Sequence, residues 1–156
     1  MAIALADLLD PKHVRLGLKS RSLENAIHEL IGLLADEHIT DAQGFAEQVA
    51  SHERTNPSVV ELGVAFPHAR TDLVEKIVLA IGRKTAGIPF GENAARANLI
   101  FLIGVPQRLV NDYLVVVGAL ARIARNESIR RQLLHAATPE EFVEIIRAAG
   151  SPDAAL

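Results

Sequence analysis

His68 is the residue of this sequence best placed to do chemistry, because it ends an apolar run in the stretch GVAFPHAR, residues 63–70. Pro67 has no backbone N–H and cannot extend a sheet ladder, so we expect His68 where a strand stops. A small Ala69 would leave one face of the imidazole open, and Arg70 could reach an anion there. A neutral imidazole nitrogen is a competent nucleophile toward phosphorus, which favours an anion received by this histidine. The alternative is a strand-end histidine whose ring is already hydrogen-bonded.

The other five histidines raise the question of a metal site. The stretches HERTN and HELIG begin like the H-E-x-x-H pattern of zinc hydrolases, but asparagine and glycine stand where the second histidine is required. We therefore predict no metal site and keep a metal hydrolase only as a third alternative. Four histidines are expected at the surface or at helix ends: His13, His28, His38 and His135.

Nucleotide and serine chemistry find no support either. The glycine-rich segment around Gly87 continues with Ile-Pro, not with the Lys-Ser or Lys-Thr of a phosphate loop, and no G-x-S-x-G elbow occurs. The chain has no cysteine, which removes thiol catalysis and thiolate metal sites. We predict no cofactor.

Composition indicates one soluble domain. The chain has 156 residues, 49% of them hydrophobic and 22% charged, so we expect a domain at 1–150 and a flexible tail at 151–156. A net charge of −3 without a basic stripe argues against nucleic-acid partners. The longest apolar runs, 99–105 and 113–121, are shorter than the roughly 18 residues of a membrane span, and no secretory signal is visible. We expect a cytoplasmic protein without membrane insertion.

Helical and strand periods alternate along the chain, which favours helices packed on a sheet. Thr40 and Gln43 form a capping-box pattern before one helix, and Asn126 and Thr138 are expected to cap two others. Segment 83–97 is polar and glycine-rich, so it is predicted to be a loop. Strands are expected at 13–18 (at an edge), 63–68, 76–82 and 99–105, and helices at 22–38, 41–54, 109–125, 127–136 and 139–149.

Residues GVAFPHARTDLVEKIVLAIGRKTAGIPFG, followed by NLIFLIGVP, resemble the type-2 IIA domains of the bacterial phosphoenolpyruvate:sugar phosphotransferase system. This fructose/mannitol class includes the nitrogen-related IIA protein and shares a G-[VI]-A-[apolar]-P-H core. The match extends over roughly residues 3 to 149. The resemblance implies an α/β fold like that of mannitol IIA, a mixed sheet of about four or five strands flanked by helices on both faces.

The resemblance also implies roles for individual residues. His68 matches the histidine that accepts a phosphoryl group from the phosphocarrier protein HPr and passes it to a IIB domain. Arg54 matches an upstream arginine near the active site, although a solvated charge at a helix end is the alternative. Tyr113 stands where the family often has a second histidine, and is either an active-site neighbour or a tyrosine packed on the sheet.

Two functions follow from these residues. The first is a phosphocarrier, a phosphotransferase component of sugar transport that uses His68 with Arg54 and Arg70 as phosphate ligands. The second is a regulatory binding module that contacts a transporter, kinase or regulator, with phosphorylation lost or used only as a switch. Tyr113 in place of the second histidine motivates the second hypothesis.

Overall fold

The computed structural model describes residues 5–56, 62–89 and 95–150, so the predicted tail at 151–156 lies outside the described residues. Among the described residues, no helix combines the length and the apolar character needed to cross a bilayer. In chain order the elements are η1 (Leu5–Leu8), η2 (Pro11–His13), β1 (Val14–Arg15), α1 (Leu23–Gly32), α2 (Ala42–Thr55), β2 (Val64–Ala65), β3 (His68–Arg70), β4 (Val78–Pro89), β5 (Arg96–Val105), η3 (Gln107–Leu109), α3 (Val110–Arg125), α4 (Glu127–His135) and α5 (Pro139–Ala149).

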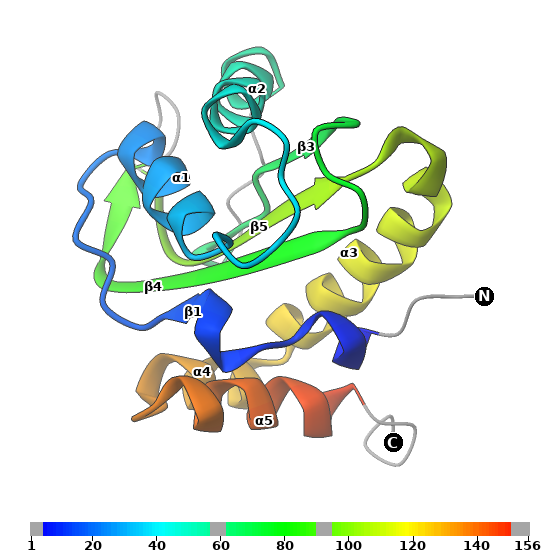
Figure 1. The fold of residues 1–156 in the computed structure, drawn as a ribbon. Helices are drawn as coiled ribbons and strands as arrows, with labels where there is room; N and C mark the ends of the chain where they lie inside the picture. The colour runs from blue at the N-terminus through cyan, green and yellow to red at the C-terminus, as the bar shows by residue number, and fades with distance from the viewer. Residues whose placement is uncertain (1–4, 57–61, 90–94, 151–156) are drawn as a thin grey trace.

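The sheet is the middle of three layers, with α1 and α2 on one face and α3, α4 and α5 on the other (Figure 1). The central strands explain this arrangement, because successive side chains of a strand point to opposite faces. In β5, Ile100 and Leu102 pack with the layer of α1 and α2. Phe101 and Ile103 pack with the layer of α3, α4 and α5. The predicted α/β fold with helices on both faces is confirmed.

The five-stranded sheet is mixed, as the resemblance implied. Its strand order is β1-β4-β5-β2, and β3 pairs with β5 beyond the end of β2. β4 and β5 are antiparallel, whereas β1, β2 and β3 each run parallel to their neighbour. β1 lies at one edge, as predicted, although it contains only two residues of the expected strand at 13–18.

The loop predicted at 83–97 is wrong, because β4 and β5 continue into this segment as an antiparallel hairpin. Ile88 pairs with Ala97, and both side chains are fully buried. The register shifts just before Ile88, and Gly87 adopts a φ of 81° that glycine tolerates without strain. The polar composition of this segment did not indicate strands, because the pairing of β4 with β5 depends on the partner strand and not on local hydrophobicity.

The stretch around Pro67 is two strands, not one. Pro67 separates β2 from β3, and its carbonyl still accepts a hydrogen bond from the backbone N–H of Ile103 at 3.0 Å. His68 therefore begins a second strand, which corrects the expectation that it lies where a strand stops. Ala69 is buried in the layer under α2, so it fills the core and does not clear space beside the imidazole.

Side-chain caps fix the helix starts. The predicted cap at Thr40 is one residue early, because the carboxylate of Asp41 accepts from the backbone N–H of Gly44 at 2.9 Å. The other two predictions are confirmed. Asn126 and Thr138 accept hydrogen bonds of 3.0 Å and 3.1 Å from backbone N–H groups three residues further on.

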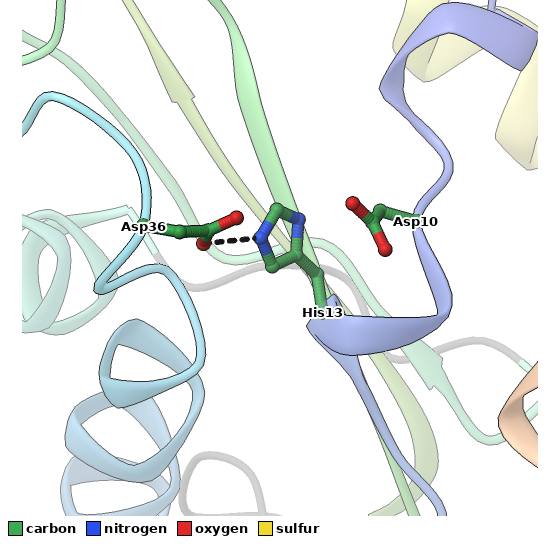
Figure 2. Close-up of side chains that lie close together, drawn as sticks. All are labelled: Asp10, His13 and Asp36. Atoms are coloured by element: carbon green, nitrogen blue, oxygen red, sulfur yellow. Dashed lines mark hydrogen bonds and ion pairs between the residues drawn. The ribbon is translucent and has the colours of Figure 1, made fainter.

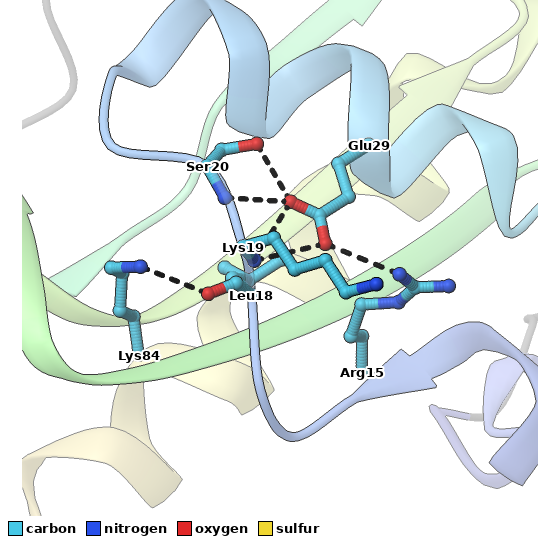
Figure 3. A network of polar contacts seen from close by, with 6 residues as sticks. All are labelled: Arg15, Leu18, Lys19, Ser20, Glu29 and Lys84. Carbon is cyan, nitrogen blue, oxygen red and sulfur yellow. Dashed lines mark hydrogen bonds and ion pairs between the residues drawn. The ribbon is translucent and has the colours of Figure 1, made fainter.

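Glu29 on α1 anchors the connection from β1 to α1 (Figure 3). Its carboxylate accepts hydrogen bonds from the backbone of Lys19 and from the backbone and hydroxyl of Ser20, the last at 2.6 Å, and it pairs with Arg15 at 3.3 Å. Burial alone would raise the pKa of Glu29, but these hydrogen bonds and the charge of Arg15 outweigh it and hold the pKa below its ordinary value. The loop is thereby held against α1.

Candidate functional site

His68 begins β3, and its half-buried ring is held in one tautomer by the backbone. Nδ1 lies 3.0 Å from the carbonyl oxygen of Phe66. A carbonyl can only accept, so Nδ1 carries the proton and the neutral ring keeps its lone pair on Nε2. Burial lowers the pKa of His68, helped by the charges of His52 and Arg70 and opposed by the Phe66 bond and Glu53. The neutral, nucleophilic form is therefore the stable one at neutral pH.

A second imidazole lies against His68 from the last turn of α2. The ring centroids of His52 and His68 are 4.6 Å apart, with an angle of 57° between the ring planes. In the sequence, His52 was interpreted only as part of an incomplete zinc pattern, so its position beside His68 was not predicted. Helical phase was the available signal, because His52 lies about 20° around the helix from the buried Phe45. It therefore belongs to the face of α2 that packs on the sheet.

Tyr113 approaches His68 from the first turns of α3, on the opposite side of the sheet edge. Its ring centroid is 5.1 Å from that of His68, and only 8% of the residue is exposed. Burial raises the pKa of Tyr113, while the charge of Arg70 opposes the change. The phenol therefore stays protonated and can donate a hydrogen bond near His68. The structure brings together the two residues that the resemblance placed side by side.

Arg70 and Arg54 are placed differently. Arg70 is exposed, lies two residues after His68 on the same side of β3, and acts electrostatically on both His68 and Tyr113. Arg54 is also exposed, and none of the described interactions of His68 involves it. It lies about 180° around α2 from Phe45, on the outer face of the helix. Glu53, by contrast, is buried next to the site.

A cluster of Asp10, His13 and Asp36 lies away from this site (Figure 2). His13 ends η2, as expected of a helix-end residue, but it is only 4% exposed and does not lie at the surface. Its Nε2 is 2.7 Å from Asp36, and one donor atom from each residue lies within 4.8 Å of the others. Such donors could hold a divalent cation. However, the ammonium of Lys12 already lies 3.7 Å from Asp10 and 3.5 Å from Asp36 and offsets part of their negative charge.

The fold and the site together define an α/β domain with a neutral histidine at its sheet edge, between a second imidazole and a phenol. Comparison with known proteins places it in a family. The chain belongs to the family described as "Phosphoenolpyruvate-dependent sugar phosphotransferase system, EIIA 2", whose model matches residues 7–149. The match covers the whole described fold and both elements that flank His68.

Curated relatives include single-domain and longer proteins. The chain is 30% identical over 125 residues to the fructose-specific EIIA component of Haloferax volcanii, covering 79% of this chain and 81% of the relative. It is 28% identical over 144 residues to the fructose-specific EIIABC component of Bacillus subtilis, covering 91% of this chain. There the match spans only 23% of the longer protein.

Two solved structures share the fold. The nitrogen regulatory protein IIA-Ntr from Neisseria meningitidis has a TM-score of 0.83 at 25% identity, covering 91% of this chain and 98% of that one. Mannitol enzyme IIA of Escherichia coli, solved in complex with phosphorylated enzyme IIB, has a TM-score of 0.78 at 22% identity, covering 90% and 97%. The fold is therefore shared by an enzyme IIA and by a nitrogen regulatory protein.

Proposed function

We propose that this chain is a phosphocarrier IIA component in which Nε2 of His68 accepts a phosphoryl group from HPr and passes it to a IIB domain. The single observation that carries the proposal is the hydrogen bond from Nδ1 of His68 to the Phe66 carbonyl. It keeps the proton on one nitrogen and leaves the other free to attack phosphorus. Family membership and the solved IIA–IIB complex of a relative support the partners.

The bonds and electrons of the proposed transfer balance without a metal ion or a nucleotide. The Nε2 lone pair forms a new bond to phosphorus, while the bond between phosphorus and the donor nitrogen breaks and that nitrogen keeps the electron pair. The Nδ1 proton stays on its bond to Phe66. Phosphoryl transfer of this kind depends on positioning and on charge neutralisation, which backbone contacts and nearby side chains can supply.

Three residues are proposed to bind the phosphoryl group. Arg70 supplies a positive charge from the same strand as His68, and Tyr113 supplies a hydroxyl donor from α3. Arg54 remains the arginine proposed from the resemblance, and its exposed position suits contact with phosphate at the moment a partner docks. Each role follows from charge or hydrogen bonding, so each can be tested by one substitution.

The test is phosphorylation in a defined mixture. The protein is incubated with phosphoenolpyruvate, enzyme I and HPr, and intact mass spectrometry counts the phosphoryl groups added. We expect one group on the wild type, none on His68→Ala, and one on His28→Ala, a matched substitution of an exposed histidine on α1. A wild type that stays unlabelled with cognate partners would refute the proposal, and labelling of His68→Ala would move the acceptor elsewhere.

A regulatory role is the second candidate, and a specific surface favours it. Leu114 and Val115, directly after Tyr113 on α3, are 61% and 59% exposed. Large exposed apolar side chains beside a site favour a protein partner that reads its state. A pull-down from native extract should compare the wild type with His68→Asp. Retention of only phosphotransferase components by both proteins would contradict this role.

A further inference from the structure

We propose that His52 is a phosphate-binding residue of this site, a proton-carrying imidazole from α2 that neutralises the phosphoryl group on His68. This inference rests on the proposed function and adds a residue that the family resemblance does not assign. It gives to His52 the contact from α2 that the resemblance gives to Arg54. The consequence is a carrier whose phosphorylated form is stabilised by a proton.

The position of His52 supports direct contact. Its ring centroid is 4.6 Å from that of His68, and the 57° tilt means that the rings are not stacked face to face. A phosphoryl group attached to Nε2 of His68 would extend outward from a ring that His52 already touches. Arg54 lies on the outer face of the same helix and is exposed. Of the two cationic candidates on α2, His52 is therefore the one in contact before any partner arrives.

Charges around His52 explain why its protonation should follow phosphorylation. Glu53 lies next to it on α2 and His68 contacts it from β3, while Arg70 on β3 and Tyr113 on α3 act on or contact that same His68. Two protonated imidazoles in contact would repel each other, as would a protonated imidazole near Arg70. A phosphoryl group carries about 1.5 to 2 negative charges and reverses this balance. The carbonyl end of α2, where His52 lies, also favours a positive charge.

The pH dependence of phosphorylation distinguishes an imidazole from a guanidinium at this position, because only the imidazole changes charge between pH 5 and 8. In the wild type, we expect the equilibrium occupancy of phosphohistidine at His68 to rise as pH falls from 8 to 6. His52→Gln should lower the occupancy at pH 6.5 by about ten- to a hundredfold, the effect of losing one charge-assisted hydrogen bond, and flatten the pH profile. His52→Arg should keep the occupancy and also flatten the profile. The control His28→Gln should match the wild type.

A second measurement does not depend on partner proteins. Potassium phosphoramidate phosphorylates imidazole with release of ammonia, so it can load His68 of the full chain without HPr. Nitrogen-15 NMR of the imidazoles, recorded against pH before and after loading, should show His52 taking up a proton at higher pH in the loaded protein. His28 should titrate identically in both states.

The outcomes distinguish the two proposals. Equal occupancy and equal pH profiles in the wild type and His52→Gln, or an unchanged titration of His52 after loading, would overturn the role of His52 and leave the phosphocarrier function intact. Loading by phosphoramidate with the expected shift, but no labelling by HPr, would refute the proposed carrier function and support the binding role of His52.

Discussion

Gly104 tests how closely α2 must approach the sheet for this site to form. It lies near the C-terminal end of β5, in register with Ala69 of β3 and Val78 of β4. A Cβ added to Gly104 would lie 2.4 Å from Cζ of Phe45 and 3.0 Å from Cγ2 of Val78. Phe45 projects from α2 and is fully buried. The absent side chain therefore sets the distance between α2 and the strand that His68 pairs with.

The cost of Gly104→Ala can be worked out from this contact. Ordinary contacts of a Cβ begin at 3.4 Å, so the ring of Phe45 would have to retreat by about 1 Å into a packed core. Overpacking of this kind costs about 1–3 kcal/mol. For a domain of this size, the melting temperature should fall by about 2–10 °C. His52 shares a helix face with Phe45, so displacement of α2 should also weaken phosphorylation of His68.

Differential scanning calorimetry checks the stability, and the phosphorylation assay checks the site. Gly32→Ala is the matched control, because a Cβ there meets nothing within 4 Å, and it should leave the melting temperature unchanged or slightly higher. Phe45→Leu removes the clashing end of the ring, so the double variant should lose less stability than the sum of the two single variants. A Gly104→Ala protein that melts with the wild type, or strictly additive effects, would refute the reasoning.

Other predictions concern single groups. Burial holds the pKa of His68 below its ordinary 6.5, so the unfolded chain binds this proton more tightly than the folded one. The free energy of unfolding, measured with urea, should therefore fall as pH drops through about 6.5. In His68→Gln it should fall less steeply over the same pH range. Tyr113→Phe keeps the ring but removes the donor, so phosphoryl occupancy should fall about tenfold with little change in melting temperature; equal occupancy would exclude the hydroxyl. Glu29→Gln should cost about 1–2 kcal/mol at pH 7. Since the pKa of Glu29 is lowered, this difference should be fully present above about pH 4.5 and shrink as pH falls further, and a difference that does not shrink on acidification would contradict the charge-based account.

Sequence patterns correctly predicted the structural features that depend on residues close together in the chain. Asn126 and Thr138 cap their helices as expected, because a cap depends on residues three positions apart. The continuous apolar runs of β4 and β5 correctly indicated strands covered on both faces. The outer part of the hairpin and the burial of His13 were not predictable in this way. Each depends on a partner distant in sequence, such as Asp36 for His13.

The residues of the site were likewise predicted only in part from the sequence. The motif placed His68 and Tyr113 correctly relative to each other, because the resemblance covers the elements that carry both. It offered Arg54 as the contact from α2, since a motif records residue types and not the face of a helix. Counting residues around α2 from Phe45 distinguishes His52, on the inner face, from Arg54, on the outer one. Helical phase therefore adds His52 to the candidates for a phosphate contact from α2, beside Arg54.

Pro67 has a consequence for chemistry as well as for the sheet. It separates β2 from β3, so Phe66 lies in neither strand, and its carbonyl turns to Nδ1 of His68. The next carbonyl, that of Pro67, accepts from the backbone N–H of Ile103 in β5, and successive carbonyls of an extended chain point to opposite sides, so the Phe66 carbonyl is directed away from β5. It is therefore the acceptor that fixes the tautomer of His68 and leaves Nε2 unprotonated. In the proposed carrier, the stretch GVAFPHAR therefore sets the acceptor nitrogen, since the carbonyl two residues before His68 holds the proton on Nδ1.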